Sequence, residues 1–144
     1  MDSLYRLTIV EREQMKQKIT VNLDALLKDI ATTGHAAVYG IYFDHDSANI
    51  TQESNPSLKA IADMLKARSL KLYVVGHTDM TGGFEYNVGL SLKRAHAVVK
   101  ALVNEYGIAV ERLLGKGAGP LCPVGSNKNE NGRKLNRRVE LVEM

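Results

Sequence analysis

The feature that most constrains how this chain folds is the alternation of short apolar runs with longer segments of helical periodicity. Residues 37–43 are apolar, and residues 70–76 alternate before they turn fully apolar; both patterns predict strands. Residues 54–67 and 84–106 instead repeat their apolar side chains at helical spacing, which predicts helices with one buried face. Because a helix that follows a strand packs on the face of the sheet, this order predicts an α/β fold.

The C-terminal part of the chain adds two more strands, at residues 112–117 and 138–142. The segment between them is rich in glycine and proline up to Pro123 and polar from Ser126, which predicts an irregular connection. The complete expectation is a two-layer α/β sandwich with the order β-α-β-α-β-β. Its mixed sheet carries the helices on one side, and an N-terminal helix precedes it.

A separate helical stripe precedes the first strand, and Gly34 ends it. Its apolar residues recur at spacings of 4, 4, 3 and 4; they are Met15, Ile19, Leu23, Leu26 and Ile30. We therefore divide the chain into an N-terminal extension at residues 1–36, taken as the tail of an upstream region, and a domain at residues 37–144. The stripe either packs on this domain, docks on a neighbouring domain, or forms a homodimer.

Composition excludes several classes of protein. Hydrophobic residues make up 44% of the chain and charged residues 24%, enough for one buried core and a polar surface. No apolar run approaches the roughly 18–20 residues needed to cross a bilayer, so membrane attachment is expected only through a part absent from this chain. The single Cys122 excludes an internal disulfide and a cysteine-built zinc site.

The side chains that carry chemistry gather around the loop before the long helix. Asp79 lies in this loop, and Asn87, Ser91 and Arg94 share one face of the helix because they are four and three residues apart. We expect that face to lie opposite much of the apolar stripe, which comprises Leu92, Ala95, Val99, Leu102 and Tyr106. Such a site suits a ligand with an ammonium and a carboxylate on one carbon. Asp79 would accept from the ammonium, and Arg94 would bind the carboxylate with two parallel hydrogen bonds.

Both charged residues also have a purely structural interpretation. Asp79 could brace a turn, and Arg94 could be a solvated helix residue. The two could also form a surface ion pair that contributes little stability. Spacing alone does not decide between these interpretations and a binding site.

Motifs spread over most of the chain favour binding. They are Gly76–Asp79, Asn87, Leu90–Ser91, Arg94–Ala95, Gly107–Ile108, Arg112, Gly117, Gly119, Pro123, Asn127, Gly132–Arg133 and Asn136–Glu140. In type and order these residues resemble the OmpA-like peptidoglycan-binding domain at the C-termini of OmpA, Pal and MotB proteins, over about residues 38–144. The resemblance implies non-covalent peptidoglycan binding without catalysis or a cofactor. It also implies a periplasmic protein that is attached to the outer membrane.

The resemblance implies roles for individual residues as well. Asp79 matches the aspartate that meets the ammonium of diaminopimelate in the stem peptide, and Arg94 matches the partner of its carboxylate. Further ligand contacts are expected from residues beside this pair, from the loop after the first strand and from the final basic motif; they are Thr78, Asn87, Leu90, Asp44, Ala48, Asn49 and Arg138. His45, Asp46 and Met80 depart from the usual pattern, which leaves the charge pair intact but bears on fine specificity.

One feature of the sequence suggests an enzyme instead. The apolar run that ends in Asp44-His45-Asp46 resembles the nucleophile motif of haloacid-dehalogenase-like phosphatases. Ala48 replaces the hydroxyl expected two residues after the second aspartate, and no later pair of acids supplies metal ligands. Cys122 has no base beside it in the sequence to activate it. A catalytic function is therefore not favoured.

The sequence carries only weak signals of a metal site or a nucleic-acid surface. A calcium loop would need glycine where Asn49 stands, whereas zinc would depend on the scattered His45, His77 and Asp79. Residues 93–138 contain ten Lys or Arg against three Glu, but the aromatic residues that would stack on bases are scattered. We expect no bound metal and no nucleic-acid partner. Steeply salt-dependent binding would instead indicate nucleic acid.

Overall fold

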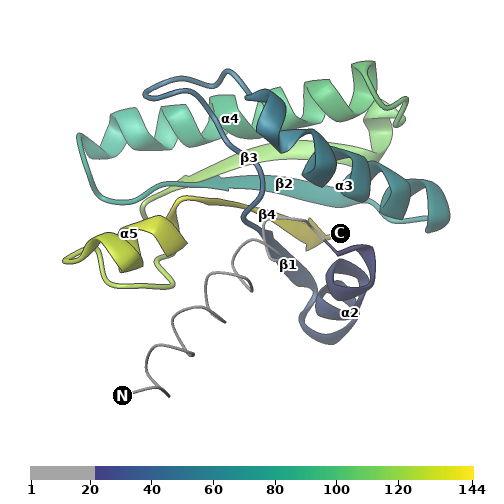
Figure 1. Ribbon diagram of the computed structural model, residues 1–144, viewed down its shortest axis with the longest axis horizontal. Helices are drawn as coiled ribbons and strands as arrows, with labels where there is room; N and C mark the ends of the chain where they lie inside the picture. The colour runs from purple at the N-terminus through teal and green to yellow at the C-terminus, as the bar shows by residue number, and fades with distance from the viewer. Residues whose placement is uncertain (1–21) are drawn as a thin grey trace, which may run out of the picture.

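The computed structural model describes residues 22–144, which form a four-stranded sheet and its helices (Figure 1). In chain order the elements are α2 (Leu23–Thr33), β1 (His35–Val38), the 3-10 turn η1 (Gln52–Ser54), α3 (Asn55–Ala67), β2 (Leu72–His77), α4 (Phe84–Asn104), the 3-10 turn η2 (Val110–Arg112), β3 (Leu113–Gly119), α5 (Glu130–Asn136) and β4 (Arg138–Glu143). None of these helices has both the length and the apolar character needed to cross a bilayer. Met15 and Ile19 of the predicted stripe lie outside the described residues.

The sheet has the strand order β1-β4-β2-β3. β2 and β3 are parallel, as a connection through a helix permits, whereas β4 is antiparallel to both β1 and β2. Figure 1 shows α3 and α4 on the same side of the sheet, with α2 beside β1. The predicted α/β fold, with a mixed sheet and a preceding helix, is confirmed.

The hydrophobic core of the described residues lies between the sheet and the helices. Val74 of β2 and Leu141 of β4 are paired across the sheet, and both are fully buried in it. From α2, Leu26 and Ile30 enter the same cluster. This contact supports the alternative in which the N-terminal stripe packs on the domain itself. The division of the chain near residue 36 stays a prediction.

The first strand is shorter than predicted. Pairing with β4 ends at Val38, and the apolar residues that follow leave the sheet. The backbone of Tyr42 is instead satisfied by Ser54, whose Oγ accepts from the nitrogen at 2.7 Å and donates to the carbonyl oxygen at 3.0 Å. The apolar run therefore does not locate the end of the strand, because Ser54, twelve residues away, forms the hydrogen bonds of Tyr42.

A short helix, α5, replaces part of the irregular connection predicted between the last two strands. Asn129 caps it, because Oδ1 of its side chain accepts from the backbone nitrogen of Gly132 at 2.7 Å. Its seven residues include one large apolar side chain, Leu135. Hydrophobic periodicity therefore cannot predict this helix.

The backbone of α4 lies directly against β2 and β3 because both strands present glycine to it. A β-carbon on Gly76 would lie 2.2 Å from the carbonyl oxygen of Ser91. One on Gly117 would lie 2.5 Å from the backbone nitrogen of Leu92. Any larger residue at either position would push the helix away from the sheet.

This close packing changes which face of α4 is buried. The buried side chains of the helix are Asn87, Ser91, Ala95, Val98 and Leu102, whereas Leu92, predicted to face the core, is 36% exposed. The prediction that Asn87 and Ser91 lie opposite the buried stripe is wrong. Near the N-terminal end of α4 the buried face contacts the backbone of strands and loops rather than apolar side chains. Polar side chains on this face therefore form hydrogen bonds with that backbone.

A buried charge network lies on the sheet face opposite the core, since its residues alternate with Val139 and Leu141 along β4. Nε of Arg138 donates to Oε2 of Glu140 at 2.7 Å, and Nε2 of His77 lies 3.3 Å from the same oxygen. Burial lowers the pKa of His77 from 6.5 to about 4, with Arg138 acting in the same direction and Glu140 opposing it. The imidazole is therefore neutral at pH 7.

Replacing Gly76 by alanine should destabilise the protein by about 3 kcal/mol, because the new β-carbon meets backbone that cannot move alone. Gly89 provides the matched control, since it lies inside α4 and a β-carbon there would point into open space rather than at a neighbouring element. Gly89→Ala should stabilise the helix by about 0.5–1 kcal/mol. Urea denaturation of both variants measures the difference, and equal stability would contradict the close-packing argument.

Stability should also fall as the pH is lowered from about 6.5 to about 4. In that window the unfolded state binds a proton at His77 and the native state does not, so protonation favours unfolding. The loss attributable to this side chain, which is 6% exposed, is roughly 2–3 kcal/mol. His77→Gln keeps a donor for Glu140 but cannot titrate, so its denaturation midpoint should depend less on pH. The exposed His45→Gln is the control, and a wild-type pH profile in His77→Gln would refute the assignment.

Candidate ligand-binding site

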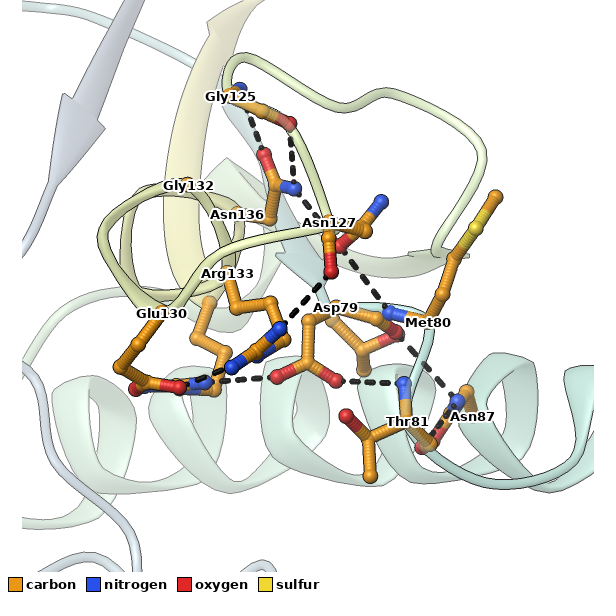
Figure 2. Close-up of polar contacts among 12 residues, drawn as sticks. Asp79, Met80, Thr81, Asn87, Gly125, Asn127, Glu130, Gly132, Arg133 and Asn136 are labelled. Carbon is orange, nitrogen blue, oxygen red and sulfur yellow. Dashed lines mark hydrogen bonds and ion pairs between the residues drawn. The ribbon is translucent and has the colours of Figure 1, made fainter.

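Asp79 is held in a bent loop directly after β2. The backbone nitrogen of Thr81 donates to its Oδ1 at 2.8 Å (Figure 2). Upstream, the nitrogen of Thr78 donates to the carbonyl oxygen of Gly119 at 2.9 Å, and its hydroxyl donates to the carbonyl oxygen of Asp79 at 2.9 Å. The carboxylate is therefore oriented by its own loop. The hydroxyl of Thr78 is used internally, so its contact with a ligand stays a prediction.

Asn87 fastens this loop to the first turns of α4. Its Nδ2 donates to the carbonyl oxygen of Thr81 at 3.0 Å and to that of Asp79 at 3.5 Å (Figure 2). The side chain is buried. Asn87 thus positions the loop, and its predicted ligand contact is not tested by this arrangement.

Two further asparagines tie the loop to the segment before α5. Oδ1 of Asn127 accepts from the backbone nitrogen of Met80 at 3.3 Å and from Nδ2 of Asn136 at 2.9 Å (Figure 2). The fully buried Asn136 also accepts from the nitrogens of Val124 and Gly125 at 2.7 and 2.9 Å. Chain segments far apart in sequence therefore hold the Asp79 loop in one conformation.

Arg137 is the direct partner of Asp79, and sequence reasoning missed it. Its Nη1 donates to Oδ2 of Asp79 at 2.7 Å, and its Nη2 donates to Oε1 of Glu130 at 2.6 Å. The neighbouring Arg138 starts β4 and lies in the buried network instead. The arginine doublet was visible in the sequence, but which of the two turns toward Asp79 depends on where α5 ends.

The two carboxylates respond to Arg137 as ion-pair partners do. Burial raises the pKa of Asp79, but the hydrogen bonds from Arg137 and Thr81 outweigh this effect, so its pKa lies below the ordinary value. The hydrogen bonds from Arg137 and Arg133 also lower the pKa of Glu130. Both acids are therefore ionised at neutral pH.

Arg94 is half-buried and does not form an ion pair with Asp79. Its Nε donates to the carbonyl oxygen of Ser47 at 2.9 Å, and its guanidinium carbon lies 4.9 Å from the centroid of the Phe43 ring. Among the described residues, neither of its terminal nitrogens has a hydrogen-bond partner. Burial lowers the pKa of Arg94, and Asp79 is among the charges that raise it, so the two side chains lie within electrostatic range.

The loop after the first strand is clamped onto α4 beside Arg94. The hydroxyl of Tyr86 donates to Oδ1 of Asp46, a residue with a left-handed backbone φ of 55°. A hollow of about 280 Å³ lies between loop and helix; it is lined by Asp46, Ser47, Ala48, Glu85, Tyr86, Gly89, Leu90 and Lys93. Two predicted site residues, Ala48 and Leu90, thus share one hollow next to the carbonyl that holds Arg94.

The other predicted residues are placed differently. Asp44 and Asn49 are exposed and close the loop, since the nitrogen of Asp44 donates to the carbonyl oxygen of Asn49 at 2.9 Å. Arg138 is buried, with all its nitrogens bonded within the protein to Glu140, Asn136 and Cys122. Its side chain is only 2% exposed, and its predicted ligand contact stays a prediction. Within residues 22–144 no three His, Cys, Asp or Glu side chains converge to hold a metal.

Comparison with known proteins matches residues 42–137 to the OmpA family. Outer membrane porin F of Pseudomonas aeruginosa is 42% identical over 101 residues, which cover 69% of this chain and 29% of that protein. The peptidoglycan-binding protein ArfA of Mycobacterium bovis is 37% identical over 103 residues, which cover 71% of this chain and 31% of that protein. The chain spans less than a third of the length of either relative.

Two solved structures are similar to this chain in sequence and fold. The peptidoglycan-associated lipoprotein of Burkholderia pseudomallei is 32% identical, with a TM-score of 0.65 over 72% of this chain and 88% of that chain. The cell wall anchor of the type VI secretion system (T6SS) of Pseudomonas aeruginosa is 29% identical, with a TM-score of 0.66 over 87% of this chain and 98% of that chain.

Proposed function

Because this chain belongs to the OmpA family, we propose that it binds peptidoglycan non-covalently through the diaminopimelate of the stem peptide. Asp79 would accept from the ligand's ammonium, and Arg94 would bind the carboxylate on the same carbon. The role is anchoring without catalysis, in a periplasmic protein attached to the outer membrane. Relatives named as outer membrane and peptidoglycan-binding proteins support this assignment.

The observation that carries the proposal is the state of Arg94. Its guanidinium is held in place by Ser47 and Phe43, yet its two terminal nitrogens have no partner among the described residues. A half-buried cation of this kind is ready to take a carboxylate, because the geometry is set before the ligand arrives. A purely structural arginine would be expected to use its terminal nitrogens within the protein.

The surroundings suit the rest of a diaminopimelate side chain. Ala48 and Leu90 line the hollow next to Arg94 and would contact the ligand's methylene groups. Thr78 and Asn87 would act mainly by holding the loop that carries Asp79. Asp44 and Asn49 stand on the exposed loop beyond them as candidate contacts.

Asp79→Asn and Arg94→Lys should each weaken the binding of meso-diaminopimelate by about tenfold or more. A charge-assisted hydrogen bond contributes roughly 1.5–3 kcal/mol, and a lysine cannot reproduce the paired donors of arginine. NMR titration of the labelled protein measures the affinity, and co-sedimentation with purified sacculi checks the natural ligand. Added salt should weaken this binding only slightly, because the bound group carries no net charge.

The exposed Lys100→Ala is the matched control, since it removes one positive charge from the same helix. It should bind as the wild type does. Wild-type affinity in both Asp79→Asn and Arg94→Lys, with their spectra still folded, would contradict the proposed site.

A further inference from the structure

We propose that Arg137 competes with the ligand's ammonium for the carboxylate of Asp79. When the ligand displaces Arg137 from Asp79, the ion pair between Arg137 and Glu130 remains. This inference rests on the function proposed above and concerns the same carboxylate. Arg137 and Glu130 would thereby control the affinity for the ligand and the discrimination between ligands with and without an amine.

The first observation is that the carboxylate of Asp79 already has a cation. Nη1 of Arg137 lies 2.7 Å from Oδ2, while Oδ1 accepts from the nitrogen of Thr81 at 2.8 Å. Both oxygens are therefore engaged before any ligand binds. The Asp79 side chain is only 11% exposed, so few directions of approach remain for a second donor.

The second observation is that Arg137 has a second carboxylate partner, Glu130. Its Nη2 lies 2.6 Å from Oε1 of Glu130, whose side chain is 61% exposed. Arg137 itself is 40% exposed, whereas the neighbouring Arg138 pairs with Glu140 in the buried network. Arg137 can thus release Asp79 while keeping one ion pair and an open path into solvent.

Electrostatics makes the two cations mutually exclusive partners. An ammonium and a guanidinium on the same carboxylate would lie a few ångströms apart and repel each other. The ligand's amine therefore binds at the expense of the Arg137–Asp79 contact. A ligand that lacks the amine leaves this contact in place and binds through Arg94 alone.

Removing the competitor should strengthen binding. Arg137→Gln should bind meso-diaminopimelate about tenfold more tightly than the wild type, because the amine no longer has to break an ion pair. Pimelate, which has the same carbon chain and carboxylates but no amine, should gain nothing. The ratio between the two affinities should therefore rise in the variant.

Removing the counter-ion should have the opposite effect. Glu130→Gln leaves Arg137 with Asp79 as its one remaining carboxylate partner among the described residues, so the amine should bind a few-fold more weakly. In the Arg137→Gln background the same change should have no effect. The control for Arg137→Gln is Lys134→Gln, which also removes one positive charge. Lys134 is exposed on α5, and this variant should bind as the wild type does.

These variants are compared by titrating meso-diaminopimelate and pimelate against the folded full chain and following backbone amide shifts. In the wild type, the side-chain Nε–Hε signal of Arg137 should shift on saturation with diaminopimelate and not with pimelate, which tests the inference even if a variant fails to fold. Weaker or unchanged binding of diaminopimelate in Arg137→Gln, with binding still weakened in Asp79→Asn, would overturn the competition by Arg137 while leaving the proposed function standing. Wild-type binding in Asp79→Asn and Arg94→Lys would instead overturn the proposed function.

Discussion

The geometry of the site depends on one constraint, the direct contact between α4 and the backbone of β2 and β3. Gly76 and Gly117 have no side chains, so the helix lies closer to β2 and β3 than packed side chains would allow. At this depth the hydroxyl of Ser91 accepts from the nitrogen of Gly119 at 2.9 Å, and Asn87 reaches the loop that carries Asp79. The helix and the loop therefore form one rigid unit, with the acid on the loop and Arg94 two turns further along the helix.

Within that unit the charges are arranged unequally. Both carboxylate oxygens of Asp79 accept hydrogen bonds from the protein, whereas within residues 22–144 Arg94 is held through Nε and the Phe43 ring. In the proposed binding mode, the partner of the ligand's carboxylate would be ready and the partner of its ammonium already occupied by Arg137. The asparagines around Met80 hold the loop backbone in place, whereas the side chain of Arg137 is 40% exposed.

Much of this could be predicted from the sequence, and the failures have physical causes. Hydrophobic periodicity located the strands and long helices, and the ordered motifs singled out Asp79 and Arg94. Periodicity could not predict that Tyr42 leaves the sheet for Ser54, because that bond joins residues twelve positions apart. It also misjudged the buried face of α4, since the glycines that admit polar side chains there lie on other elements. Arg137 escaped notice because the end of α5 decides which arginine of the pair faces the loop.

The same glycines have a consequence for how copies of the domain meet. β3 lies at an edge of the sheet, where a free strand could add a further strand from another molecule. Its sequence, Leu-Leu-Gly-Lys-Gly-Ala-Gly, has little side-chain surface to stabilise such an addition, and its outward Lys116 brings charge to the edge. Gly117, which lets α4 pack directly on β3, therefore also makes this edge strand a poor template for aggregation.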